Sequence, residues 1–451
     1  MSALLRPRPE LGSPAAWRFP DFEETRLGNG MRVLWLHRPG KQVATVAAVL
    51  DLPVDADPAG LEGAASIAAR SLNEGTRTRS VDEFADALER HGATFGADAG
   101  YSGLTATLDV PVSRLVSAFP LLCEALTAPA FPAGEVDRVA RQRLAEIVRE
   151  RSNPPSRAAV EFGAALHAPG TRRALPSAGT EASVSALTAA DVGALYGGRA
   201  SASTATLLVA GDLAGIDVPA LVSDGLGSWT GASAPAWSPS EPSVVPGPRS
   251  VVVDRPDAVQ TQVVIGHGSV DRRSPDWAAM ALAAYALGGT LTSRIDAVLR
   301  EEKGYTYGMR ARFAPDRLGG TFTVSGSFDT ANTEPALDDL AGILRGAVAE
   351  GLRQDERDAA SEFLAGVSPT RWETPDSLVR QAATLVGCDL PLSWVNEYLT
   401  GLRESSLDDV NAALRTHVRP DELVVVAVGA ASGITGPLER LGFGTPEVLP
   451  A

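Results

Sequence analysis

The chain has 451 residues, enough for two or three domains and a large core. Its 44% hydrophobic and 21% charged residues are typical of globular proteins and exclude bulk disorder. The net charge is −15 and no run of Lys and Arg occurs, which excludes nucleic acid as a partner. The apolar stretches at 43–50 and 278–287 are too short to span a bilayer, and Cys123 and Cys388 do not form a disulfide framework. We therefore expect a cytoplasmic protein that does not enter a membrane.

A segment rich in Pro, Ser, Gly and Ala, residues 228–248, divides the chain into two halves of similar size. Such a composition buries too little apolar surface to fold, which is typical of a linker. We expect an N-terminal extension at 1–20, a first domain at 21–227 and a second domain at 249–451.

The first half begins with a predicted hairpin, because Asn29-Gly30 stands between two strand-like segments and favours a type I′ turn. A buried strand at 43–50 follows. Ser80 is the expected N-cap of a helix at 81–91, and Gly92 its C-terminal stop. The remaining predicted elements are a helix at 63–72, a strand pair within 92–110, helices at 112–126, 133–151 and 158–167, and a strand at 206–211.

The second half repeats this order of elements. Strands are predicted at 251–253, 260–267, 307–313, 320–328 and 423–429, and helices at 276–287, 291–302, 334–351, 354–367, 375–386 and 407–416. The segments that close the halves, TLLVAGDL and LVVVAVGAAS, are similar. We therefore predict an α+β protein of two homologous domains, each with a mixed, mainly antiparallel sheet covered by helices. Two unrelated α/β domains are the alternative.

Few residues suggest chemistry of their own. The five histidines, at 37, 91, 167, 267 and 417, are never three or four residues apart, so no helix presents two imidazoles on one face. No G-x-S-x-G elbow, P-loop or dinucleotide fingerprint occurs, and the pair Gly288-Gly289 lacks a phosphate-binding context. The residues alone indicate a protein that is not an enzyme by itself.

Residues 63–76, GAASIAARSLNEGT, resemble a motif of the pitrilysin/insulinase family of zinc metallopeptidases. There an inverted H-x-x-E-H places two zinc-binding His and a general-base Glu on one helical face. When the segments are aligned, Ser66 and Arg70 stand at the two His positions and Ala69 stands at the base. The resemblance places the third ligand at Val139, seven residues before Glu146. None of these four residues is a good zinc ligand, and Arg70 would repel the ion. We expect no metal in this chain.

Residues 286–313, ALGGTLTSRIDAVLREEKGYTYGMRARF, resemble the second-domain signature of the same family. In that signature an Arg and a Tyr seven residues apart face the zinc across a cleft, and the matching residues are Arg300 and Tyr307. A guanidinium can hold a substrate carbonyl, and a phenol can donate to the oxyanion formed during peptide hydrolysis. Tyr305 is the nearby competitor. The resemblance also assigns the glycine-rich turn, Gly288 and Gly289, to substrate binding.

The resemblance implies a zinc-free subunit that is inactive alone and pairs with a homologous subunit carrying H-x-x-E-H and the zinc. Together they would cleave unfolded or short peptides, for example leader or targeting peptides. In the family, substrate peptides add as a strand to a sheet edge of the zinc domain. A purely structural family member is the first alternative, and a peptidase with an unconventional metal site the second.

Overall fold

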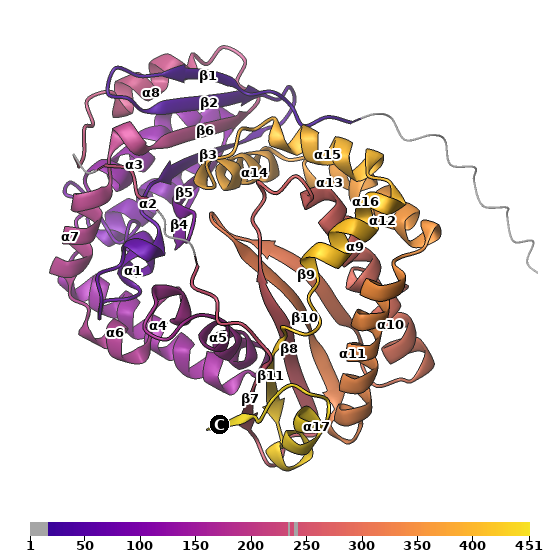
Figure 1. Ribbon diagram of the computed structural model, residues 1–451. Helices are drawn as coiled ribbons and strands as arrows, with labels where there is room; N and C mark the ends of the chain where they lie inside the picture. The colour runs from indigo at the N-terminus through magenta and orange to yellow at the C-terminus, as the bar shows by residue number, and fades with distance from the viewer. Residues whose placement is uncertain (1–16, 233–234, 239–241) are drawn as a thin grey trace, which may run out of the picture.

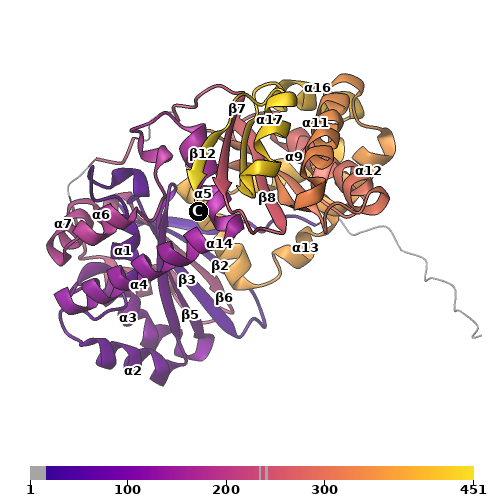
Figure 2. The ribbon, with the colours of Figure 1, turned by 90° about the horizontal axis from the view of Figure 1, so that it is seen from below.

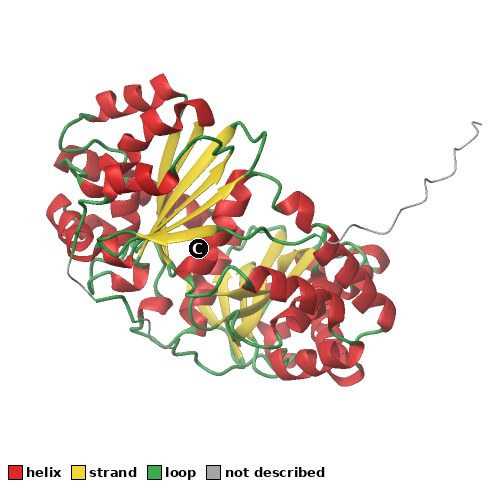
Figure 3. Cartoon of the chain, turned by 90° about the horizontal axis from the view of Figure 1, so that it is seen from above, coloured by secondary structure: helices red, strands yellow, loops and turns green. Residues whose placement is uncertain are grey.

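The computed structural model describes residues 17–232, 235–238 and 242–451, and its strands form two six-stranded sheets (Figures 1 and 3). The strands of the first sheet lie within residues 23–211 and those of the second within 249–450, on either side of the predicted linker. Residues 1–16 of the predicted extension and 233–234 and 239–241 of the linker lie outside the described residues. The first sheet contains β1 (Glu23–Arg26), β2 (Arg32–His37), β3 (Val43–Leu50), β4 (Thr94–Gly100), β5 (Gly103–Pro111) and β6 (Thr206–Gly211). The second contains β7 (Arg249–Asp254), β8 (Gln260–Ser269), β9 (Met309–Pro315), β10 (Gly320–Asp329), β11 (Val424–Gly429) and β12 (Glu447–Pro450).

The two sheets share one topology. Their strand orders are β1-β2-β6-β3-β5-β4 and β12-β7-β11-β8-β10-β9, so five of the six positions correspond one to one in chain order. The pairs β2–β6 and β7–β11 are parallel, and the strands from β6 to β4 and from β11 to β9 are antiparallel. The closing strands β6 and β11 are fully buried, and each is the third strand in the order of its sheet. The predicted α+β fold with two mixed sheets is confirmed.

Helices cover the sheets. Those of the first half are α1 (Ala64–Arg70), α2 (Val81–His91), α3 (Leu115–Thr127), α4 (Ala133–Ser152), α5 (Pro154–Leu166), α6 (Glu181–Ala186), α7 (Ala189–Arg199) and α8 (Val218–Leu226). Those of the second half are α9 (Trp277–Gly288), α10 (Arg294–Asp296), α11 (Thr333–Glu350), α12 (Gln354–Gly366), α13 (Ser368–Arg371), α14 (Pro375–Gly387), α15 (Trp394–Glu404), α16 (Leu407–His417) and α17 (Thr435–Arg440). Within the described residues, none of the helices has the length and apolar character needed to cross a membrane.

Local signals explain some boundaries and fail at one turn. The side chain of Ser80 accepts from the backbone of Glu83, whose carboxylate accepts in return, and Gly92 ends α2 with φ 60°. The type I′ turn was wrong, because only Gly30 of the Asn-Gly pair has a positive φ, 90°. Asn29 stays out of that region because its amide donates to the carbonyls of Leu226 and Trp229, both at 2.8 Å. The tertiary contact outweighs the local preference.

Each half contributes a helix to the core of the other half (Figure 2). Helix α5 of the first half packs on β8 and β11, with Phe162 buried among the valines of the second sheet. Helix α14 of the second half packs on β3 and β6, where Leu378 and Ala382 join the core. Near the N-terminus, Trp17 stacks on Trp372 at 5.4 Å between ring centroids. The largest apolar cluster therefore contains residues of both halves, while the first half keeps a second cluster of its own.

Candidate functional site

The helix that carries the altered zinc motif, α1, is firmly anchored. Its N-cap, Gly63, has φ 102°, and a Cβ there would come within 2.8 Å of the carbonyl oxygen of Ala178. The carboxylate of Asp57 accepts from the backbone nitrogens of Gly63 and Ala65 at 2.7 and 2.8 Å. Because Asp57 satisfies nitrogens that a helix start leaves free, α1 keeps a fixed position against its neighbours.

A cavity of about 590 Å³ lies at this helix, and three side chains line it at the altered motif: Ser66, Arg70 and Glu146. One terminal nitrogen of Arg70, Nη1, donates to both carboxylate oxygens of Glu146 at 2.9 and 2.8 Å. Val139 and Ala69 do not line the cavity; both are buried in the core of the first half, at 2% and 1% exposure. Of the two α4 positions in the motif, Glu146 therefore lines the cavity with Ser66 and Arg70, whereas Val139, the position that the motif alignment selected for the ligand, does not.

The electrostatics of the cavity are those of a closed ion-pair network. Arg143, whose side chain is 4% exposed, donates to Glu146 at 3.3 Å and to Glu150 at 2.9 Å. Burial opposes ionisation of Glu146, but hydrogen bonds and charge from Arg70 and Arg143 outweigh it and hold its pKa below the ordinary value. In the described residues, no three His, Cys, Asp or Glu side chains gather as metal ligands would. The guanidinium of Arg70 thus neutralises a carboxylate where the family places its metal motif.

Arg300 lies in a helical segment that differs from the prediction. The sequence predicts one helix over 291–302, but α10 is only three residues long and continues as a π-helix, η5, over Ala297–Glu302. Lys303 donates its backbone N–H to the carbonyl of Val298, an i to i−5 bond. The Arg300 side chain is 32% exposed and its Nε lies 3.5 Å from Glu301. Short π-helical segments are frequent at functional sites, which agrees with the prediction for Arg300 without testing it.

Tyr307 lies two residues before the edge strand β9 and is 89% exposed. Its chain segment is nevertheless held on both sides. Asp296, which is fully buried, accepts from the backbone nitrogen of Met309 at 2.7 Å and from Arg310 at 3.0 Å. The Thr306 hydroxyl accepts from the backbone nitrogen of Gly308 at 3.0 Å. The structure therefore presents a solvent-facing phenol from a fixed backbone.

Sequence reasoning missed Asp296, although an acid between the apolar residues Ile295 and Ala297 is a usable signal. Among the described contacts, no hydrogen bond joins Arg300 to Tyr307. The competitor Tyr305 is partly buried and packs against the second-half core.

The glycine pair has a structural explanation. A Cβ on Gly288 would lie 2.6 Å from the backbone nitrogen of Ala311, and one on Gly289 would lie 2.5 Å from the ring of Tyr285. Packing of α9 on β9 requires Gly288, and the close approach of Tyr285 in the preceding turn of α9 requires Gly289, so their assignment to substrate binding stays a prediction.

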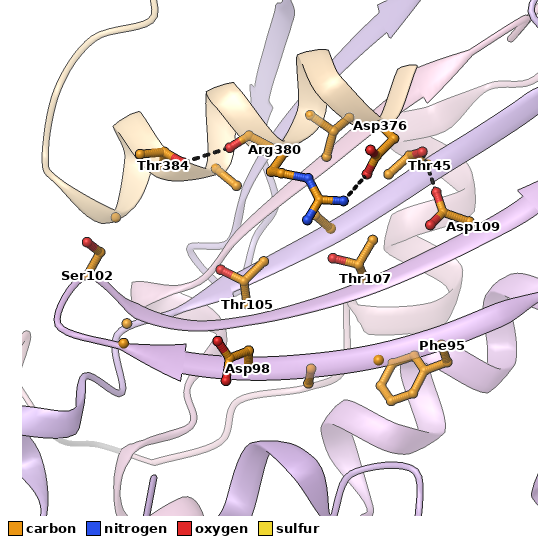
Figure 4. Close-up of a pocket in the computed structure, with 18 of the residues that line it drawn as sticks. Thr45, Phe95, Asp98, Ser102, Thr105, Thr107, Asp109, Asp376, Arg380 and Thr384 are labelled. Carbon is orange, nitrogen blue, oxygen red and sulfur yellow. Dashed lines mark hydrogen bonds and ion pairs between the residues drawn. The ribbon is translucent and has the colours of Figure 1, made fainter. Parts of the chain in front are cut away.

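A second cavity, of about 630 Å³, opens between the strands β4 and β5 and helix α14 (Figure 4). Its sheet wall carries Thr105, Thr107 and Asp98, and on the helix Arg380 donates to Asp376 at 2.7 Å. The alternation of polar residues along β5 is the sequence signal that predicts this wall. Because β4 is an edge strand, the cavity lies beside unpaired backbone groups.

Comparison with known proteins decides the family. Residues 32–172 match the sequence model described as insulinase (peptidase family M16), and residues 186–364 match the one described as peptidase M16 inactive domain. The chain belongs to the M16 peptidase family. Similar proteins include the non-peptidase homolog YmxG of Helicobacter pylori, 24% identical over 81% of this chain and 84% of that protein. An uncharacterized zinc protease of Mycobacterium bovis is 26% identical over 80% of this chain and 82% of its own length.

Solved structures agree with this M16 assignment. The peptidase M16 inactive domain from Pseudomonas fluorescens has a TM-score of 0.82 and 26% identity, over 91% of this chain and 98% of that one. A protease from Helicobacter pylori has a TM-score of 0.83 at 16% identity, over 91% and 99%. The second match shows the fold alone.

Proposed function

We propose that this M16 chain is the zinc-free subunit of a heterodimeric metallopeptidase and that it supplies Arg300 and Tyr307 to the site of peptide hydrolysis. The observation that carries the proposal is Tyr307: it is 89% exposed, yet the backbone next to it is held, at Gly308 by the Thr306 hydroxyl and at Met309 by buried Asp296. A phenol fixed in this way can donate to an oxyanion that forms on a partner's zinc site. In its own chain, this side chain has no packing role.

The first-half cavity supports the zinc-free part of the proposal. Arg70 takes up the carboxylate of Glu146, and Ser66 offers only a neutral hydroxyl. Zinc would be held by the H-x-x-E-H partner, and the substrate would be an unfolded or short peptide. A leader or targeting peptide and a cytoplasmic location are parts of the same proposal.

The second candidate is a purely structural subunit. One observation favours it: Arg300 is paired with Glu301 at 3.5 Å, and the described contacts do not join it to Tyr307. The similar chains named non-peptidase homolog and inactive domain fit either candidate.

The test begins with co-expression of this chain and a homologous chain that carries H-x-x-E-H. We expect one equimolar species on size-exclusion chromatography, with a peptidase activity that neither chain has alone. Full activity of the H-x-x-E-H chain by itself would exclude the heterodimer.

Tyr307→Phe in that complex should lower kcat by about 10²–10³-fold with little change in KM, as for loss of one oxyanion donor. Tyr305→Phe is the matched control and should change kcat little. Wild-type kcat for Tyr307→Phe in an intact complex would leave the structural subunit as the better proposal.

A further inference from the structure

The inner face of β9, at the edge of the second sheet, forms a positively charged wall. Met309 and Ala311 of β9 point into the core with the helices, so Arg310 and Arg312 point to the opposite face. Figure 1 shows the helix layer on one side of these strands and the first half on the other. Helix α5, the element of the first half that covers this sheet, packs on β7, β8 and β11. The part of the inner face formed by β9, where Arg310 and Arg312 are exposed, remains for another occupant.

The two charged side chains of β9 on this face are positive. Asp329, which alternation along β10 places on the same face, lies at the end of that strand, beyond its pairing with β9. The side chain of Arg310 is 52% exposed and has buried Asp296 as its partner, whereas Arg312 is exposed and takes part in none of the ion pairs of the described residues. Across the hairpin, Arg310 faces Ser325 and Arg312 faces Thr323, so the neighbouring strand adds hydroxyls and no carboxylate. The acidic residues Glu301 and Glu302 belong to η5, which packs on the helix layer beside α11.

We propose that this wall binds peptide segments that carry acidic side chains at alternate positions. Arg310 and Arg312 are two residues apart on one strand, which places them about 6–7 Å apart along it. An extended peptide presents its residues i and i+2 on one face with the same spacing. Because β9 is an edge strand, unpaired backbone groups lie beside the two arginines. Arg310 lies three residues after Tyr307, so a peptide on this wall would lie next to the proposed catalytic phenol. The inference rests on the proposed function and adds the class of peptide that the subunit would bind.

The net charge of the protein opposes the binding of acidic peptides, so such binding would identify the wall as its cause. A chain of charge −15 repels acidic peptides at long range and attracts basic ones. A preference for acidic peptides can therefore arise only from a local positive surface such as this wall.

The test is peptide binding to the isolated chain, measured by fluorescence anisotropy at low salt. The probes are three labelled dodecapeptides. Two consist of Glu and Ser in the same amounts, one with Glu at alternate positions and one with Glu in adjacent pairs, and the third has Lys in place of the alternating Glu. We expect the alternating Glu probe to bind most tightly. Arg312→Glu should weaken this binding about tenfold and Arg312→Gln about threefold, the size of one exposed charge contact removed or reversed. Arg345→Glu, on the exposed side of α11 at 51% side-chain exposure, is the matched control and should bind like the wild type.

Equal or tighter binding of the Lys probe, or an unchanged affinity in Arg312→Glu, would overturn the proposal. The assay needs no zinc subunit, so its outcome is independent of the kinetics of Tyr307→Phe. If the probe fails to bind while Tyr307→Phe still lowers kcat, the substrate class is wrong and the proposed function stands. If the probe binds as expected while Tyr307→Phe has wild-type kcat, the acidic-peptide wall stands and the catalytic role of the subunit falls.

Discussion

Two substitutions should convert the closed ion-pair network of the first half into a zinc site. In Ser66→His/Arg70→His both imidazoles would line the cavity that Glu146 already lines. Two His and one carboxylate, with a position left for water, are the ligands of many zinc hydrolases. The variant omits the general base at position 69, so it tests metal binding without activity.

The stability that the two substitutions remove and the stability that bound zinc adds are of similar size. Removing Arg70 breaks an ion pair whose side chains are 33% and 29% exposed, which costs about 1 kcal/mol at such exposure. A larger side chain at buried Ser66 costs about 1–3 kcal/mol, less where it can extend into the cavity. Zinc at a hundred times its Kd returns about 2.7 kcal/mol. The apo variant should therefore melt below the wild type, and zinc should raise its Tm close to the wild-type value.

The assay combines thermal melts with cobalt absorption spectra at pH 7.5, where the imidazoles are neutral ligands. The wild type should show no cobalt spectrum, and adding Glu146→Gln to the double variant should abolish the spectrum. The opposite control adds Val139→Glu. If the double variant binds no cobalt but the one with Val139→Glu does, position 139 provides the third ligand and our placement of Glu146 is refuted.

Three further predictions concern stability. Asp296→Ala should lower the free energy of unfolding by about 2–4 kcal/mol in urea, because it leaves a buried backbone nitrogen and a guanidinium without their acceptor; a wild-type midpoint would contradict this. Gly288→Ala should destabilise the protein by about 2–3 kcal/mol in thermal melts, because the added Cβ would lie 2.6 Å from the backbone of β9. The control Gly346→Ala, where the added Cβ meets open space, should leave stability unchanged or raise it slightly. Burial lowers the pKa of His267 to about 4 from 6.5, so the unfolded chain takes up a proton first as pH falls. The free energy of unfolding should therefore drop by about 3 kcal/mol between pH 6.5 and 4. If the free energy of unfolding of His267→Gln falls equally steeply over this pH range, protonation of His267 is not the cause.

Elements whose signals are local could be predicted from the sequence. The bounds of α2 agree because Ser80, Glu83 and Gly92 fix both ends through contacts within a few residues. The duplicated topology was also accessible, because β6 and β11 are buried on both faces and read as similar apolar runs. The prediction missed the helices α6, α7, α8, α13, α15 and α17 and the strand β12. Strand β12 is a short edge strand that ends in Pro450, a pattern that argues against a strand.

The candidate site was harder to predict because its details depend on tertiary contacts. Positions 139 and 146 are seven residues apart, so they lie on nearly the same stripe of α4, and periodicity cannot choose between them. The structure distinguishes them because the core takes in Val139, whereas Glu146 reaches the cavity. Likewise, Asp296 meets Met309 across thirteen residues, and no local pattern announces that pairing.

Because α5 packs on the second sheet and α14 on the first, the two halves are held together by these helices as well as by the covalent link between them. Each sheet completes its apolar face with a helix encoded in the other half, as two subunits of an intertwined dimer do. A half produced alone would leave one face of its sheet exposed to water, so the cooperative unit of folding is the whole chain. Breaking the chain between 228 and 248 would leave two fragments that hold each other by those helices, which makes this segment the natural place to divide the gene.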